Sequence, residues 1–386
     1  MKAKLKGINM KININEDKYK NLLIHHRQEF HKIPEISTNL PKTKAYIMSV
    51  LETLDCEIIP VLHSGVCAFF NRSHNHTTAY RSDMDGLPIT EKNTCSYTST
   101  HEGKMHACGH DGHMSMVITL AQYVDTQKRL DSNVLIIFQP AEETTGGAKD
   151  ICDLGILEKY KVNRIFGIHL WPFIPWGTIS SKANAMMPRS SEINISITGK
   201  ASHATCPKEG IDALRISCEY LQQIYAAHDQ KKSTEVSPEE RTIIQLCKLE
   251  SGTARNIIPG YSKILGTIRA FSDKDFLTLI GILEGTAKEI AAKYSCDINV
   301  AHSQGYPPII NDPVLYDEFV SSIPSLDYIE MDKPAMISED YSFYGLHVPS
   351  VFFFVGTGTG IALHSNNFDF DGGCMISGLK MYISLL

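Results

Sequence analysis

The chain has 386 residues, of which 43% are hydrophobic, and a formal net charge of −6. This composition excludes a disordered chain and a strongly basic one, so we expect a folded protein that does not bind nucleic acid. No stretch approaches the roughly 18 apolar residues of a membrane span, and no signal-like apolar segment follows the lysines of residues 2–11. The ten cysteines lack the spacing of a disulfide framework, which predicts reduced thiols and a cytoplasmic location.

The first part of the chain alternates helical segments with short apolar runs. The pattern predicts helices over residues 19–31, 42–54 and 110–124, and strands over residues 65–70, 78–81, 134–138 and 165–170. Continuous apolar strands separated by helices are typical of an α/β fold with a buried, mainly parallel sheet flanked by helices. Residues 350–355, near the end of the chain, form another continuous apolar run, which predicts a further buried strand of the same sheet.

Residues 182–302 have a different character. Here Ile193, Ile195 and Ile197 alternate with polar residues, as in a half-exposed strand. The segment as a whole reads strand, helix, strand, strand, helix, strand, which is the split βαβ pattern of a small two-layer domain. We therefore predict a discontinuous catalytic domain, residues 1–181 and 303–386, interrupted by one smaller βαββαβ domain, residues 182–302.

The densest chemical signal is the run from His106 to His113, which contains three histidines, a cysteine and an aspartate. Gly109 and Gly112 allow close packing of the backbone, so side chains of one turn can converge. Thiolate and imidazole are ligands that suit zinc and other first-row divalent metals. The run therefore predicts a metal site where the helix of residues 110–124 begins.

Three further signals follow apolar strands. Glu142 and Glu143 come after the strand of residues 134–138, and one carboxylate can bind metal while the other takes a proton from water. His169 closes the next strand, and His364 lies in the loop after the last one. Either histidine alone is more often a core residue. Ligands collect at the carboxyl ends of strands in open α/β sheets, however, so together these residues predict one site.

Short motifs stand in order over nearly the whole chain, at residues 27–35, 80–89, 106–113, 139–143, 202–204, 252–259, 266–271, 339–343 and 363–365. They resemble the aminoacylase/carboxypeptidase family of co-catalytic metallohydrolases. The most similar branch contains hippurate hydrolases, plant auxin-conjugate amidohydrolases and bacterial N-acetyldiaminopimelate deacetylases.

The resemblance implies a site for two divalent ions, which would be zinc, manganese or cobalt. Its ligands would be Cys108, which bridges the ions, and His110, Glu143, His169 and His364. Glu142 would be the general base. Asp83 would lie behind a metal-ligand histidine and orient it, and His106 and His113 would lie outside the ligand set.

The resemblance also implies that residues 182–302 form a lid and the interface of a homodimer. His203 would reach an active site, often that of the partner subunit, and stabilise the oxyanion of the reaction. Asn256 and Arg269 would hold the substrate carboxylate, which suits the planar fork of arginine. From the residues alone, a salt bridge on the strand face accounts equally well for Arg269.

The activity implied is hydrolysis of the amide bond of N-acyl-amino acids, such as N-acetyl- or N-benzoyl-amino acids, with N-acetyldiaminopimelate among the candidates. One alternative is a dipeptidase or carboxypeptidase that acts on short peptides. A second alternative is a non-catalytic ligand-binding protein on the same scaffold. The complete ligand set and Glu142 argue against the second alternative.

Overall fold

The computed structural model of the chain describes residue 12 and residues 14–386. The lysine-rich start, where the sequence predicts no secretory signal, lies outside these residues. The chain forms two compact units, which we call the main unit and the inserted unit. The main unit consists of Met1–Met186, Ile310–Asp332 and Glu339–Leu386, and the inserted unit consists of Met187–Ile309 and Lys333–Ser338.

The boundaries of the units differ from those expected from the sequence, residues 181/182 and 302/303. Strand β7 (Asn184–Met187) pairs with β14 (Ile309–Asn311), so both ends of the insertion are drawn into the main unit. Residues 333–338, which we expected in the main unit, belong to the inserted one.

The main unit contains a sheet with strand order β1-β2-β4-β3-β5-β16-β6-β15. Its strands are β1 (Glu57–Val61), β2 (Gly65–Phe70), β3 (Thr77–Asp83), β4 (Asn133–Gln139), β5 (Val162–Trp171), β6 (Ile179–Ser181), β15 (Tyr328–Glu330) and β16 (Ser350–Gly356). The four adjacent strands β4, β3, β5 and β16 run parallel to one another. This arrangement confirms the predicted fold class.

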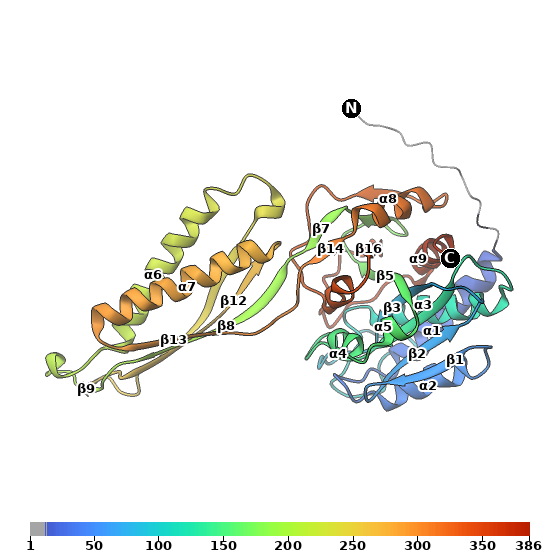
Figure 1. Cartoon of the computed structure of the whole chain (residues 1–386). Coiled ribbons are helices and arrows are strands. Elements are labelled where there is room, and N and C mark those ends of the chain that lie inside the picture. Colours follow the sequence, from blue (N-terminus) through green and yellow to red (C-terminus); the bar gives the residue numbers. More distant parts are fainter. Residues whose placement is uncertain (1–11, 13) are drawn as a thin grey trace. The chain divides into compact units, whose positions relative to one another are not determined.

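Helices cover the sheet (Figure 1). They are α1 (Glu16–His31), α2 (Pro41–Leu51), α3 (His110–Thr126), α4 (Gly147–Asp153), α5 (Ile156–Lys159), α8 (Pro313–Ser322) and α9 (Met375–Ser384). Helices α1, α3 and α9 pack together, and their apolar side chains share one core with Val134, Ile136 and Phe138 of β4. Alternate residues of β4 therefore face this helical layer, as the period of a strand requires. Among the described residues, none of the helices combines the length and apolar composition that crossing a membrane requires.

The inserted unit has a sheet with strand order β10-β12-β8-β13 and a core of its own. Its elements are β8 (Arg189–Thr198), β9 (Ser202–His203), α6 (Ala213–Lys232), β10 (Ile243–Ser251), β11 (Ile257–Ile258), β12 (Tyr261–Ala270), α7 (Asp273–Tyr294) and β13 (Asp297–His302). Helices α6 and α7 lie side by side on one face of the sheet (Figure 1). The alternation of Ile193, Ile195 and Ile197 is explained by this arrangement, because all three side chains are buried under the helices.

A buried network of charges joins α1 to α3. The Asp111 carboxylate lies 2.7 Å from His31 Nδ1 and 3.1 Å from Arg27 Nε. His31 Nε2 lies 3.0 Å from a carboxylate oxygen of Glu91. Burial opposes a charge on the imidazole, but these carboxylates outweigh it and raise the pKa of His31 to about 9. His31 is therefore protonated at neutral pH and helps to hold the two helices together.

We expect the stability of the protein to fall above neutral pH because of His31. Its pKa is about 9 in the folded state and 6.5 for a free histidine, so its contribution is complete below pH 6.5 and is lost as the pH rises through 9. The free energy of unfolding should decrease by on the order of 2–3 kcal/mol over this range. Denaturant titrations at several pH values measure it. His31→Gln should remove most of this dependence and His25→Gln, on an exposed residue, should keep it; equal behaviour of the two variants would contradict the assignment.

Asn311 of β14 is a buried polar anchor in the main unit. Its Oδ1 accepts the N–H of Phe352 at 2.7 Å, and its Nδ2 donates to the carbonyl oxygens of Lys182 at 2.8 Å and Phe352 at 3.1 Å. One amide thus ties the strand that follows the insertion to β16 and to the segment that precedes the insertion.

Asn311→Ala should lower the free energy of unfolding by about 2–3 kcal/mol, because it leaves buried backbone groups without hydrogen-bond partners. The comparison is Asn299→Ala, at an exposed position of β13, which should change stability little. Chemical denaturation followed by circular dichroism measures both variants. Equal losses in the two would show that Asn311 is not an anchor.

Candidate active site

The candidate site lies at the carboxyl ends of the parallel strands. Asp83 is the last residue of β3 and lies opposite Gln139, the last residue of β4, in the strand register. Glu142 and Glu143 follow the end of β4 after two intervening residues, and His169 lies near the end of β5. The sheet thus places side chains that are distant in sequence at one edge, as the strand pattern predicted.

Cys108 and His110 reach this edge through the start of α3. Gly109 has a φ of 89°, a left-handed conformation that suits glycine, and it places Cys108 at the N-terminus of the helix, where the helix dipole favours a thiolate. At Gly112 a Cβ atom would lie 2.5 Å from Leu170 Cδ1, so α3 packs directly against the end of β5.

This close packing brings together the donor atoms that the sequence predicted. Cys108 Sγ lies 3.4 Å from His169 Nε2. Ligand atoms of Cys108, His110 and His169 all lie within 4.8 Å of one another, and those of Cys108, Glu143 and His364 form a second such group. Because Cys108 belongs to both groups, it is the residue that would contribute to both sites if each group held an ion. The structure thus gathers all five predicted ligands, while their binding of metal stays a prediction.

His110 has the properties of a metal ligand. Its Nδ1 donates to the backbone carbonyl of Asp85 at 2.7 Å, and its buried Nε2 has no hydrogen-bond partner in the described part of the chain. Burial lowers the pKa of His110, and burial together with His113 lowers the pKa of His169 to about 3. Both rings are therefore neutral at neutral pH, which is the form that binds metal.

The charge of the site also suits divalent cations. Burial raises the pKa of the Cys108 thiol, and the carboxylates of Glu143 and Glu142 raise it further. Burial likewise raises the pKa of Glu142, with Glu339 as the next largest cause. A bound cation reverses such shifts and stabilises a thiolate outright. A donor set of thiolate, imidazole and carboxylate that carries this much negative charge fits two divalent ions.

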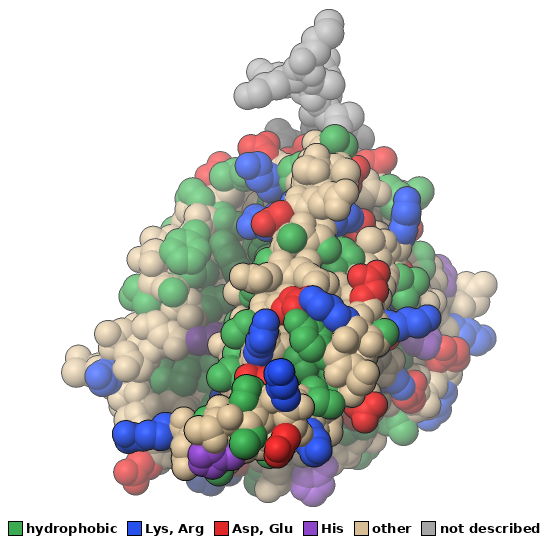
Figure 2. Space-filling model, turned by 90° about the vertical axis from the view of Figure 1, so that its left-hand side faces the viewer, with side chains coloured by type: hydrophobic (Ala, Val, Ile, Leu, Met, Phe, Trp, Pro, Cys, Tyr) green, Lys and Arg blue, Asp and Glu red, His purple; other side chains and the backbone are tan. Residues whose placement is uncertain are grey.

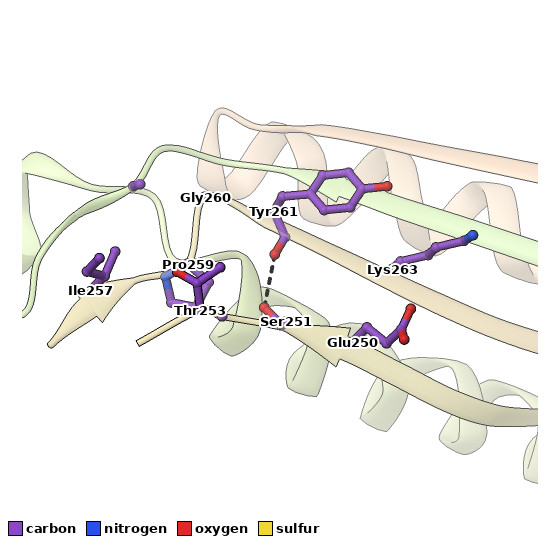
Figure 3. Close-up of a pocket in the computed structure, with 10 residues that line it drawn as sticks. Glu250, Ser251, Thr253, Ile257, Pro259, Gly260, Tyr261 and Lys263 are labelled. Atoms are coloured by element: carbon purple, nitrogen blue, oxygen red, sulfur yellow. Dashed lines mark hydrogen bonds between the residues drawn. The ribbon is translucent and has the colours of Figure 1, made fainter. Parts of the chain in front are cut away.

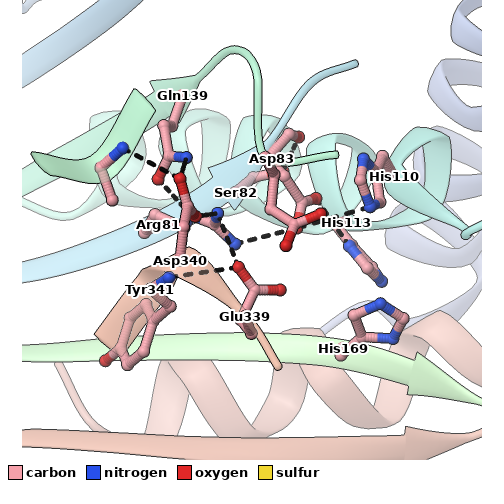
Figure 4. Close-up of polar contacts among 12 residues, drawn as sticks. Arg81, Ser82, Asp83, His110, His113, Gln139, His169, Glu339, Asp340 and Tyr341 are labelled. Carbon is pink, nitrogen blue, oxygen red and sulfur yellow. Dashed lines mark hydrogen bonds and ion pairs between the residues drawn. The ribbon is translucent and has the colours of Figure 1, made fainter. Parts of the chain in front are cut away.

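Asp83 contacts His113, a histidine that lies outside the predicted ligand set. Its Oδ1 lies 2.7 Å from His113 Nδ1, whereas its Oδ2 is 3.8 Å from Nε2 of the predicted ligand His110 (Figure 4). The N–H of Leu170 donates to His113 Nε2 at 2.9 Å. Asp83 therefore orients His113, and through it the backbone beside His169.

Sequence reasoning missed Asp85. Its carboxylate accepts the backbone N–H groups of Glu142 at 3.0 Å and Glu143 at 3.2 Å, so it fixes the loop that carries both glutamates. The signal was present, since Asp85 follows Asp83 by two residues at the end of a buried strand. His106 is buried outside the donor groups, with its ring centroid 6.5 Å from that of His31.

Two residues of the site have a strained backbone. Ala141, just before the glutamate pair, has a φ of 65°, and His364 has a φ of 63°. A left-handed conformation costs of order 1–3 kcal/mol for a residue with a side chain and is retained where the surrounding structure enforces it. Both loops of the candidate site are therefore held in unfavourable conformations by their packing.

The predicted residues of the lid lie in the inserted unit. His203 on β9 pairs with Ile257 on β11, and the N–H of Ala204 donates to the carbonyl of Asn256 at 3.0 Å. His203 and Asn256 therefore lie beside each other in this unit. The His203 side chain is exposed, with its Nδ1 2.7 Å from the hydroxyl of Thr205.

Arg269 on β12 is half-buried. Its Nη1 donates to the Thr267 hydroxyl and, at 2.9 Å, to the carbonyl of Ile268. Within the described ranges the guanidinium forms no ion pair, so the alternative of a strand-face salt bridge is not realised. Arg269 keeps its charge without a carboxylate partner of its own unit.

An open pocket of about 500 Å³ lies in the inserted unit between the ends of β10, β11 and β12 (Figure 3). Exposed Ile257 and Tyr261 line it together with Glu250 and Lys263. The described residues that line it include none of the groups of candidate metal ligands. Acidic and basic side chains are interspersed on the face drawn in Figure 2 and do not gather into one basic patch.

Comparisons with known proteins show the family to which the chain belongs. The model of the peptidase family M20/M25/M40 matches residues 79–386. A Staphylococcus aureus protein (strain bovine RF122 / ET3-1), named an uncharacterized hydrolase, is 33% identical over 373 residues, which cover 94% of this chain and 96% of that protein.

Two solved structures share the fold. A Bacillus subtilis protein described as a dinuclear metal binding peptidase from the M20 family has a TM-score of 0.82 and 27% identity, covering 96% of this chain and 98% of that chain. A protein from methicillin-resistant Staphylococcus aureus has a TM-score of 0.89 at 23% identity and 96% coverage of both chains. The resemblance expected from the sequence is confirmed. The chain belongs to the peptidase family M20/M25/M40 and is a hydrolase of that family.

Proposed function

We propose that this protein hydrolyses the amide bond of N-acyl-amino acids and releases a carboxylate and a free amino acid. The observation that supports this most is the pair of donor groups that share Cys108, with the buried carboxyl group of Glu142 beside Glu143. Substrates of this class include N-acetyl- and N-benzoyl-amino acids and N-acetyldiaminopimelate. A cytoplasmic location remains part of the proposal.

The metal ions would be held by residues of the main unit. The proposed ligands of two zinc, manganese or cobalt ions are Cys108, His110, Glu143, His169 and His364. Such ions polarise a carbonyl group and lower the pKa of water when they are bound. Asp85 orients the ring of His110 and the loop of Glu143, which favours binding because the donor atoms are arranged beforehand.

Glu142 is the proposed general base. It would accept a proton from the attacking water and return it to the leaving nitrogen as the C–N bond breaks, so the products are a carboxylate and a free amine. Burial raises its pKa, and a base is most effective when its pKa lies near the working pH. The Asp85 carboxylate holds the backbone of Glu142 at 3.0 Å, so the base is fixed from the main-chain side.

The inserted unit would recognise the substrate. Arg269 has no carboxylate partner among the described residues of its unit, and it would bind the substrate carboxylate together with Asn256. His203 would donate to the oxyanion that forms at the scissile carbonyl. The substrate class rests on these positions and on the family resemblance.

Glu142→Gln should lower kcat about 10²–10⁴-fold, the usual contribution of a general base, while two metal ions per subunit remain bound. Glu52→Gln, at an exposed position of the main unit, is the matched control and should keep full activity. Wild-type activity should disappear on treatment with a chelator and return with added zinc, manganese or cobalt. Kinetics and elemental analysis of the same samples measure these effects.

The substrates for this experiment are acetyl-, benzoyl- and succinyl-amino acids, N-acetyldiaminopimelate and dipeptides. Faster turnover of dipeptides than of every N-acyl-amino acid would favour the peptidase alternative. Undiminished activity of Glu142→Gln would show that another residue is the base. Absence of bound metal and of all activity in the wild type would favour a binding protein.

We also propose a homodimer formed through the inserted unit. Ile257 is 43% exposed and Tyr261 is 53% exposed, and both line the pocket described above. Large apolar side chains exposed together are typical of contact surfaces. Ile257 pairs with His203 in the small β9–β11 sheet, so such an interface would lie next to the proposed oxyanion donor.

Mixing two inactive variants tests whether His203 acts in the partner's site. In a dimer of Glu142→Gln with His203→Ala, one of the two sites contains both native residues if they come from different subunits. Full exchange of subunits should then restore about a quarter of wild-type activity. Activity no greater than that of the separate variants would place His203 in its own subunit's site, and sedimentation measures the oligomeric state in parallel.

A further inference from the structure

Arg81 is a fully buried cation with more carboxylates around it than its charge can balance. Its Nη1 lies 2.8 Å from Asp83, and its Nη2 lies 2.9 Å from Glu339 and 2.7 Å from Asp340 (Figure 4). Its Nε donates to Gln139 Oε1 at 2.8 Å. Three carboxylates therefore share one guanidinium at the inner end of the site, out of contact with solvent.

This cluster lies beside both the proposed metal ligand His169 and the proposed base Glu142. On one side Asp83 contacts His113, which bonds the backbone beside the ligand His169. On the other side, one carboxylate oxygen each of Glu142, Glu339 and Asp340 lie within 4.8 Å of one another. Arg81 thus lies between Asp83, which orients His113, and the two acidic residues next to Glu142.

The two acidic residues on the base side are held differently. Asp340 is bonded on several sides, since Gln139 donates to it at 2.6 Å and the N–H of Ala148 at 3.0 Å, in addition to Arg81. Glu339 is held through one oxygen, its Oε1, which receives Arg81 Nη2 and, at 3.2 Å, the N–H of Tyr341. Glu339 is therefore fixed at one end of its carboxyl group and lies against Glu142.

The chemistry of the pair is consistent with a direct effect on the base. After burial, Glu339 is the largest cause of the raised pKa of Glu142. Burial also raises the pKa of Glu339, although Arg81 opposes this. A carboxylate oxygen of Glu339 lies within 4.8 Å of one of Glu142, and Glu339 is anchored by Arg81, so the position of Glu339 limits the orientations open to the Glu142 side chain.

We propose that Glu339, anchored by Arg81, is a positioning residue that keeps the carboxyl group of Glu142 in the orientation needed to act as base. The proposal rests on the proposed function of Glu142. It adds that the same guanidinium determines the placement of the base and, through Asp83 and His113, of the ligand histidine.

Glu339→Leu tests the proposal, because leucine fills similar volume without a polar group. Loss of orientation should lower kcat about 10²-fold, with KM within about twofold and both metal ions retained. Glu339→Gln should recover most of this loss, since its amide can still bond Arg81, Tyr341 and Glu142. Glu52→Leu is the matched control on an exposed residue and should leave kcat unchanged.

A double-variant cycle separates positioning from a general structural role. If Glu339 acts through Glu142, adding Glu339→Leu to Glu142→Gln should cost little beyond the single loss. Losses that multiply, or an undiminished kcat in Glu339→Leu with metal bound, would overturn the proposal. If the leucine variant does not fold, Glu339→Asp replaces it, because it keeps the charge for Arg81 and withdraws the carboxyl group from Glu142. An unchanged kcat in that variant would equally overturn the proposal.

The same variants test the proposed function independently of the positioning role. The proposed function of Glu142 fails if Glu142→Gln is fully active, regardless of the kcat of the Glu339 variants. The positioning role fails if Glu142→Gln is inactive while the Glu339 variants keep the wild-type kcat.

Discussion

Acidic groups buried at the carboxyl ends of the central strands impose the main physical constraint on this protein. A carboxylate removed from water is strongly destabilising unless it is paired with a cation or hydrogen-bonded. Arg81 supplies one positive charge for Asp83, Glu339 and Asp340. The remaining negative charge, around Cys108 and the glutamate pair, is the environment in which divalent cations would be bound.

The same constraint controls the protonation states that the proposed reaction needs. Burial lowers the pKa of the His110 and His169 imidazoles, whereas the hydrogen bond to Glu143 raises the pKa of His364. Burial raises the pKa of Glu142, but at Asp83 the nearby His110, His113 and Arg81 outweigh burial and lower the pKa. Asp83 therefore stays ionised as an acceptor for His113. One buried region thus holds an ionised carboxylate that orients its neighbours and a carboxyl group suited to accept a proton, because the neighbours of the two differ.

Division of labour between the two units follows from the positions of these groups. Every proposed metal ligand belongs to the main unit, where strand ends and the start of α3 converge. The proposed grips on the substrate, Arg269 and Asn256, belong to the inserted unit, which has a core of its own. The proposed metal site and the proposed substrate contacts would therefore belong to units that each have a hydrophobic core of their own.

Periodicity in the sequence was sufficient to predict the α/β class, the parallel strands and the βαββαβ pattern of the insertion. A strand buried on both faces has a continuous apolar run, and a strand buried on one face alternates apolar and polar residues. The run of histidines and a cysteine before a helix, and the glutamates and histidines after apolar strands, also indicated one metal site. The set of five ligands came from the family resemblance and stays a prediction. Unit boundaries were less accurate, because the pairing of β7 with β14 joins segments far apart in the chain.

Only the tertiary structure revealed the contacts of Arg81, Asp85, His113 and Glu339. An arginine or a glutamate has many possible partners, and local sequence does not show which one it meets. Asp83 could be predicted as an orienting residue, but its partner was decided by the packing of Gly112 against Leu170, which brings α3 onto β5. The sequence by itself determined which chemical groups are present and at which edge of the sheet they gather. The tertiary structure decided which of them touch, because contacts between distant segments depend on packing that no local pattern records.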